Sequence, residues 1–153
     1  MKNLIKVALY QPDIPQNTAA IIRLCACFKT KLDIIGPCGF NLADKRLKRV
    51  TMDYKDNCEI KLFSNYEEFI VNRKNERIIL MTTKSKKKYN IFKFKKNDIL
   101  LFGRESAGVP ERLHRSIKNK VKIPINKKTR SLNVATSVAI IASEALRQNN
   151  FLK

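Results

Sequence analysis

Histidine and cysteine are scarce and are not spaced as metal ligands. The chain contains a single histidine, His114, and four cysteines, at positions 25, 27, 38 and 58. No two cysteines form a CxxC pair and no Cys/His quartet can be assembled, so no zinc site is expected. Cysteines of this kind are typical of small buried residues in the reducing cytosol. We therefore expect a cytoplasmic protein that binds no metal.

Long apolar runs are also missing. No run approaches the roughly 18 residues of a membrane-spanning helix, so we expect no membrane segment. The first six residues lack the apolar core and cleavage site of a signal peptide, and we interpret them as part of a strand. Neither an internal repeat nor a linker is visible, and 153 residues is the size of one domain. We predict a single domain over residues 1–153.

Acidic residues are few. Asp and Glu number 13 against 32 Lys and Arg, which gives a formal net charge of +19. This excess favours a polyanionic partner, with nucleic acid as the first candidate. The 22 Lys, 17 Ile and 14 Asn also fit a drift toward A/T-rich codons, in which many lysines would be solvated filler. Uniform drift does not explain why residues 84–130 hold 16 of the cations and only 3 carboxylates.

Short apolar runs alternate with helical patterns along the chain. They predict strands at 4–10, 32–36, 58–63, 77–82, 99–102 and 121–125, and helices at 17–28, 44–50, 65–71, 110–116 and 132–149. Asn17 is a suitable N-cap for the first helix. The basic connection 83–96 is predicted to be loop with a little strand. The alternation predicts an α/β fold with a mostly parallel sheet and helices on both faces.

The last predicted helix, 132–149, is apolar or small on nearly every side. The core of a single protomer buries only one face of such a helix. The excess apolar surface predicts a second contact, and we expect a homodimer that packs through this helix.

Two strand-to-loop junctions lie close together in the C-terminal third. The first, 102–110, has two glycines, a carboxylate and a proline, but neither a Walker lysine nor the GxGxxG spacing. Its glycines would let the backbone approach a ligand, with a purely structural turn as an equal alternative. The second, 123–133, offers apolar walls and free backbone donors at a helix start. Alone it fits an ordinary helix cap better; together the two junctions predict one pocket, for a methyl donor.

The order of these stretches resembles the three motifs of the SPOUT superfamily of RNA methyltransferases. The nearest match is to the short, single-domain tRNA (cytidine or uridine) 2′-O-methyltransferases that act at the wobble position. The resemblance runs essentially from end to end and includes Asn17-Thr18 and Arg23 in the first predicted helix. Its later motifs are Phe102-Gly103-x-Glu105-x-x-Gly108-Val109-Pro110, Ile123-Pro124 and Ser131-Leu132-Asn133.

The resemblance implies a deep C-terminal trefoil knot that binds S-adenosylmethionine in a bent form. It also implies a dimer in which an arginine of one protomer faces the cofactor of the other. By position, Arg23 would lie at the ribose 2′-hydroxyl, with Asn17, Glu105 and Asn133 as supporting catalytic groups. The implied cofactor-binding residues are Met81, Thr82, Gly103, Ile123, Ser131 and Leu132.

Methyl transfer to ribose is an in-line displacement in which the 2′-oxygen attacks the sulfonium methyl group. No metal is required, because the leaving sulfur is already activated. The protein must align three atoms and help to remove a weakly acidic proton. A guanidinium has five N–H donors and no acceptor, which makes it a poor base, so we expect Arg23 to orient the hydroxyl and stabilise its developing charge, while phosphate or water takes the proton. A surface arginine lying along an amphipathic helix is the alternative.

Three groups of cations are expected to contact tRNA phosphates: Lys45, Arg46 and Arg49 with Lys48, then the lysines of 84–96, then Lys127, Lys128 and Arg130. The expected activity is ribose 2′-O-methylation of tRNA at wobble cytidine or uridine. Alternatives are methylation of ribosomal RNA or another tRNA position, a non-catalytic RNA-binding protein on the same scaffold, and, from charge alone, a DNA- or membrane-surface-binding protein. Positions that depart from the family pattern are Ala19, Ala20, Arg104, Ala135 and Ser143.

Overall fold

The computed structural model describes residues 5–54 and 56–150, and these form one six-stranded sheet. The strand order is β3-β2-β1-β5-β4-β6 and every neighbouring pair is parallel, so the predicted α/β fold is confirmed. The strands are β1 (Ile5–Tyr10), β2 (Lys31–Ile35), β3 (Ile60–Phe63), β4 (Ile78–Met81), β5 (Asp98–Phe102) and β6 (Asn119–Val121).

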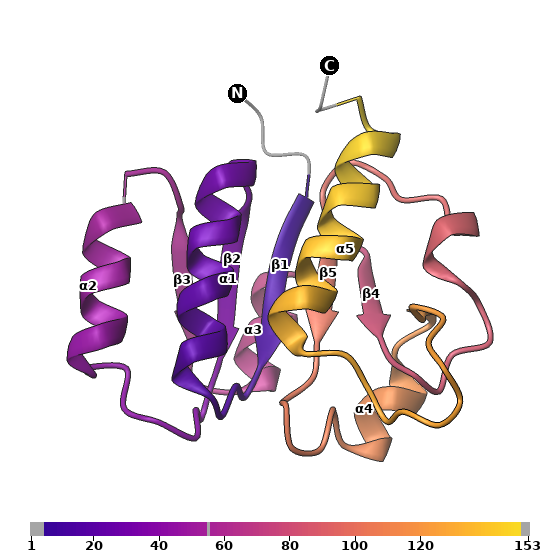
Figure 1. The fold of residues 1–153 in the computed structure, drawn as a ribbon, viewed down its shortest axis with the longest axis horizontal. Coiled ribbons are helices and arrows are strands. Elements are labelled where there is room, and N and C mark those ends of the chain that lie inside the picture. The colour runs from indigo at the N-terminus through magenta and orange to yellow at the C-terminus, as the bar shows by residue number, and fades with distance from the viewer. Residues whose placement is uncertain (1–4, 55, 151–153) are drawn as a thin grey trace.

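Helices cover both faces of the sheet (Figure 1). One face carries α1 (Pro15–Phe28), α2 (Lys45–Tyr54) and α5 (Val134–Gln148), and the other carries α3 (Tyr66–Asn72) and α4 (Glu111–Ser116). Successive side chains of a strand point to opposite faces. Val7 and Leu9 accordingly belong to the core under α1 and α5, while Ala8 belongs to the core under α3 and α4. Burial on both sides explains why the central strands are continuously apolar.

The first helix begins earlier than predicted. It starts at Pro15, with Ile14 at the N-cap position and no side-chain cap, so the prediction that Asn17 caps it is wrong. Proline suits the first helical turn because its fixed φ is helical and its missing N–H would have no partner there. Asn17 therefore lies inside the first turn, where its side chain is available for contacts with other parts of the chain.

The sixth strand is also displaced from its prediction. Residues 119–121 pair with β4, whereas residues 122–125 leave the sheet. Pro124 has no N–H to donate to a ladder, which disfavours a strand at that point. In the connection 83–96 the predicted strand is absent: its regular element is a 3-10 helix, η1 (Tyr89–Ile91), and Lys88 makes an isolated bridge with Lys122.

Other boundaries differ by a few residues. The second helix runs four residues past its predicted end, to Tyr54, and β3 starts at Ile60 rather than at residue 58. The last helix starts at Val134 instead of residue 132, because the Asn133 side chain accepts from the Thr136 N–H and caps it. Cys25 and Cys58 are buried as expected, but Cys27 is exposed. Among the described residues no helix is long and apolar enough to cross a membrane, and no metal-ligand cluster occurs.

An ion pair between the buried Asp98 and the half-buried Arg77 fixes the start of β5. Asp98 is 1% exposed and accepts from Arg77 Nε at 2.8 Å and from the Lys95 N–H at 2.7 Å. Arg77 in turn donates to the Lys93 carbonyl. These contacts hold the lysine-rich connection 83–97 against the sheet at the amino end of β5, while the carboxyl ends of β4 and β5 are left to form the site.

Candidate functional site

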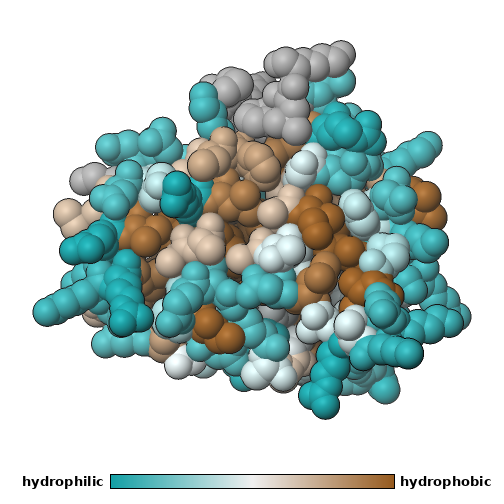
Figure 2. All heavy atoms as spheres, in the orientation of Figure 1, coloured by the Kyte–Doolittle hydropathy of each residue, from teal (hydrophilic) through white to brown (hydrophobic). Residues whose placement is uncertain are grey.

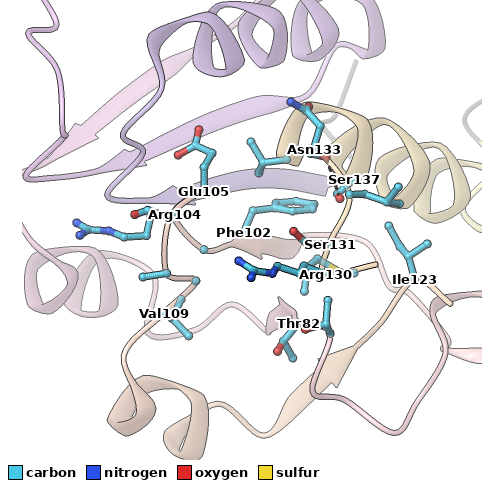
Figure 3. Close-up of a pocket in the computed structure, with 18 of the residues that line it drawn as sticks. Thr82, Phe102, Arg104, Glu105, Val109, Ile123, Arg130, Ser131, Asn133 and Ser137 are labelled. Carbon is cyan, nitrogen blue, oxygen red and sulfur yellow. Dashed lines mark hydrogen bonds between the residues drawn. The ribbon is translucent and has the colours of Figure 1, made fainter. Parts of the chain in front are cut away.

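A cavity of about 640 Å³ opens at the carboxyl ends of β4 and β5 and is bounded by the loop after β6 and the start of α5. Figure 3 shows side chains from these separate stretches around one hollow. The buried Phe102 forms part of its wall. All six residues that the sequence suggested for cofactor binding line it: Met81, Thr82, Gly103, Ile123, Ser131 and Leu132.

The loop after β5 closes on itself across its two glycines. Arg104 and Gly108 exchange two backbone hydrogen bonds, of 3.1 and 2.8 Å. A Cβ on Gly103 would lie 2.5 Å from the Gly108 carbonyl carbon, so only glycine fits there. Gly108 has a φ of +66°, a conformation that glycine adopts without a steric penalty. The glycines are thus required by the loop itself, and the closed loop presents its backbone to the cavity.

A directional chain of hydrogen bonds joins the three predicted supporting groups. The Thr136 N–H donates to Asn133 Oδ1 at 3.2 Å, and Asn133 Nδ2 donates to Asn17 Oδ1 at 2.9 Å. Asn17 Nδ2 then donates to Glu105 Oε1 at 3.3 Å. Because a backbone N–H can only donate, the first bond fixes the orientation of both amides. The chain therefore ends on Glu105 as an acceptor, at the cavity wall.

Glu105 lies beside a second carboxylate. Its Oε2 accepts from the Asp13 N–H at 2.9 Å, and the Asp13 carboxylate accepts from Ser106 Oγ. Burial and the neighbouring Asp13 carboxylate raise the pKa of Glu105, whereas hydrogen bonds from Glu105 and Ser106 lower the pKa of Asp13. Two carboxyl groups at one site favour different protonation states in this way. The side chains of Arg104 and Glu105 point in different directions (Figure 3). Arg104 donates to Gln11 Oε1.

The cavity includes residues that sequence reasoning missed. His114 lines it, and its Nε2 lies 3.2 Å from Thr82 Oγ1. Ile14 and Ser137 also line the cavity. Ile14 and Ser137 are close in sequence to predicted residues and could have been found as their neighbours. Nothing in the sequence marked His114, because only the packing of α4 against β4 brings it to Thr82.

Of the remaining predicted residues, Lys84 and Arg130 line the cavity and the others named below do not. Arg130 lines it, whereas Lys127 and Lys128 are on the exposed loop before it. Arg23 is exposed and lies six residues beyond Asn17, which turns it to another side of α1 about 9 Å further along the axis. The first predicted group of tRNA-contacting cations is on α2, which lies next to α1 and away from the cavity in the same protomer: Lys45, Arg46 and Arg49.

The fold and the cavity define an α/β protein with a ligand site at the carboxyl ends of parallel strands, the usual position in open sheets of this kind. Residues 4–143 match the SpoU rRNA Methylase family, and the chain belongs to that family.

Similar proteins agree with this assignment. A tRNA (cytidine(34)-2′-O)-methyltransferase of Beijerinckia indica is 44% identical over 93% of this chain and 90% of its own. A solved structure described as "Structural insights into the 2-OH methylation of C/U34 on tRNA" is 33% identical, with a TM-score of 0.91 over 97% of both chains. An AdoMet-bound rRNA methyltransferase of Sinorhizobium meliloti is 26% identical, with a TM-score of 0.85 over 96% of this chain and 57% of that one.

Proposed function

We propose that the protein is an S-adenosylmethionine-dependent 2′-O-methyltransferase that modifies the ribose of the wobble nucleotide, cytidine or uridine 34, in tRNA. The tRNA specificity is supported by the relative from Beijerinckia indica and by the structure concerned with C/U34, both of which cover nearly the whole chain. The observation that carries the proposal is a single cavity, to which three stretches separated in sequence bring all six expected cofactor-binding residues. The hydrogen-bond chain from Asn133 through Asn17 to Glu105 lies beside it.

The cavity fits a nucleoside-sized cofactor. Its volume of about 640 Å³ lies within the usual range of ~300–1,000 Å³ for small-molecule sites. Phe102, Ile123 and Leu132 supply apolar surface suited to an adenine ring. Glycine at position 103 lets the loop after β5 fold back onto Gly108, so that the loop backbone lines the cavity. When bound, S-adenosylmethionine supplies an activated methyl group on a sulfonium centre.

The chain's own groups then have separable tasks. Glu105 places a negative charge at the cavity wall, and Asn17 and Asn133 hold it in one orientation. A fixed charge and fixed amides need no rearrangement when a ribose hydroxyl enters, which is how preorganised polar groups assist a reaction. Arg23 would orient the hydroxyl with its guanidinium donors and stabilise its oxygen as the proton leaves.

Arg23 can take this role only if it comes from another copy of the chain, because it does not line the cavity of its own protomer. We propose a homodimer that packs through α1 and α5. Apolar side chains gather over these helices on the face shown in Figure 2, with hydrophilic side chains on both flanks. Half-buried or exposed residues there include Leu24, Ala20, Ala139 and Ile140. Burying such a patch against a second copy would bring Arg23 toward the other cavity.

We further propose that the single domain contains the SPOUT trefoil knot. In support, residues 122–133 leave β6 at the sheet edge and return to α5, which packs beside β1. The connection 83–97 contacts the chain on both sides of segment 122–133: at Lys122 where it starts and at Gln148 of α5 after it. Lys122 N–H donates to the Lys87 carbonyl at 2.8 Å, and Gln148 Nε2 of α5 donates to the Phe92 carbonyl at 2.9 Å. A loop bound on both sides of a returning segment is the arrangement that a knot needs.

The test is a map of ribose methylation by mass spectrometry in tRNA treated with the purified protein and S-adenosylmethionine. The expected product carries one added methyl at ribose 34. An Arg23→Ala variant should bind cofactor normally but lose turnover. The matched control is Arg112→Ala, an exposed helical arginine of α4, outside both the cavity and the proposed dimer contact. Methylation only of ribosomal RNA or of another tRNA position would refute the wobble assignment. RNA binding without methyl transfer would refute the enzymatic one.

A further inference from the structure

Six lysines gather along the free edge of the sheet. They come from two segments: Lys86, Lys87 and Lys88 precede η1, and Lys118, Lys120 and Lys122 lie in or beside β6. Backbone contacts bring the segments together, because Lys122 N–H donates to the Lys87 carbonyl and Ser85 Oγ donates to the Lys120 carbonyl at 2.9 Å. Lys88 and Lys122 form a parallel bridge. We call these six residues the edge-lysine cluster.

The cluster has no compensating acidic partner. Within the described part of the chain, no carboxylate lies within 4.0 Å of any of the six ammonium groups, whereas nearby Lys84 pairs with Glu111. Lys86, Lys88 and Lys118 are exposed. Like charges held side by side repel one another in the free protein, and binding of an anion relieves this repulsion. The surface therefore fits a partner with regularly repeated negative charge.

The cluster begins at the rim of the cavity. Ile123, a cavity residue, follows Lys122 directly, about 3.8 Å away from Cα to Cα. Thr82, on the same wall, donates its N–H to the Val121 carbonyl at 3.0 Å. From there the lysines follow β6 back to Lys118, a distance of roughly 13 Å at ~3.3 Å per residue. A polyanion with one residue in the cavity would thus meet the cluster without a gap.

The basic residues of α2 are placed differently. That helix packs beside α1 near the β3 side of the sheet (Figure 1). The strand order places β3 and β6 at the two opposite edges. Five strand spacings of ~4.8 Å separate these edges by about 24 Å. Lys45, Arg46 and Arg49 are therefore remote from the cavity of their own protomer. An RNA strand that enters the cavity of one protomer therefore lies beside the edge-lysine cluster of that protomer and not beside its α2 cations.

We propose that the edge-lysine cluster binds backbone phosphates of the RNA strand whose target ribose occupies the cavity of the same protomer. This inference rests on the proposed function for the identity of the RNA. Phosphate contacts of this kind add affinity without reading sequence. The alternative role of lysines on an edge strand is to prevent the strand from pairing with other sheets. If that were their only role, removal of their charge would leave RNA binding unchanged.

Three triple variants with the same number of removed charges test the proposal. The first variant combines Lys86→Gln, Lys88→Gln and Lys118→Gln from the edge-lysine cluster. The control combines Lys29→Gln, Lys61→Gln and Lys74→Gln, three lysines that are also exposed. The α2 variant combines Lys45→Gln, Arg46→Gln and Arg49→Gln. The measurement is the Kd for unmodified tRNA transcript between about 50 and 200 mM salt, since each lost phosphate contact lowers the salt slope by ~1. A Lys→Arg version of the first set keeps the charge.

The first variant should bind tRNA at least tenfold more weakly, with a salt slope lower by about two to three. Its cofactor affinity and its kcat at saturating tRNA should stay unchanged, and the arginine version should bind like the parent protein. Equal tRNA affinity in the first variant and the control would overturn the proposal, as would a loss confined to the α2 variant. Aggregation with unchanged tRNA affinity would leave edge protection as the cluster's role. A parent protein that binds tRNA but methylates none would reject the proposed function alone.

Discussion

Gly103→Ala is the sharpest test of the cavity wall. The added methyl group would lie 2.5 Å from the Gly108 carbonyl carbon, 2.6 Å from its Cα and 2.9 Å from the Val109 nitrogen. All three are backbone atoms, so no side-chain rotation can relieve the contact. The strands on either side prevent β5 from moving, and the loop after it must open. Overpacking of this kind costs roughly 1–3 kcal/mol.

That cost should appear mainly as lost cofactor affinity. The loop bonds between Arg104 and Gly108 hold the backbone that faces the cavity. If binding requires the closed loop, 1–3 kcal/mol corresponds to a Kd about 5- to 150-fold higher at ~1.4 kcal/mol per factor of ten. Isothermal titration with S-adenosylmethionine and with S-adenosylhomocysteine measures it, and thermal unfolding shows how much the free protein loses.

Gly108→Ala is the matched control. A Cβ there meets no atom within 4 Å, but its φ of +66° is left-handed, which costs roughly 1–2 kcal/mol for an L-residue. It should therefore lower stability while weakening cofactor binding less than Gly103→Ala does. The reasoning is refuted if Gly103→Ala binds cofactor within twofold of the parent protein and melts at the same temperature.

Three further changes have clear expected outcomes. Asn133→Ala should lower the free energy of unfolding by about 1 kcal/mol through loss of the α5 cap, and it should also lower kcat. Asn133→Ser restores a cap but not the amide that donates to Asn17. The free energy of unfolding measured by calorimetry should therefore recover in Asn133→Ser, while kcat stays low. The melting temperature of Glu105→Gln, measured relative to that of the parent protein, should fall as the pH is lowered. Because burial raises the pKa of Glu105, the ionised carboxylate disfavours folding above that pKa, and this penalty on the parent protein should vanish as the pH falls below the unfolded value near 4.5. Gln offers one acceptor oxygen where Glu105 offers two, to Asn17 and to the Asp13 N–H, and that loss shifts the difference equally at every pH; a difference that does not change with pH would contradict this. Asp98→Ala should cost about 1.5–3 kcal/mol in urea unfolding, because the half-buried Arg77 loses its carboxylate and the Lys95 N–H loses its acceptor. Exposed Asp53→Ala should change the stability by no more than about 0.5 kcal/mol.

Local sequence patterns predicted the central sheet well, because burial on both faces leaves few alternatives to a short apolar strand. Residues 99–102 and 78–81 behave in this way. The same reasoning failed where a proline could act in two ways. Pro15 begins a helix rather than ending a loop, and Pro124 lies three residues beyond the end of β6 rather than within it. In both cases the tertiary contacts of the flanking residues decided between conformations that the sequence alone allows.

The sequence by itself determined the alternation of strands and helices, the glycines of the loop after β5 and the excess of positive charge, since each depends on composition or short-range spacing. Only the tertiary structure decided which side chains meet. Asn17, Glu105 and Asn133 come from three distant segments, and their order in one hydrogen-bond chain follows from how α1 and α5 start beside the same strand ends. The cations were visible as a count, but parallel pairing with β4 put β6 on an edge and gathered six lysines there. Contacts between distant segments depend on the packing of whole helices against the sheet, which no local pattern specifies.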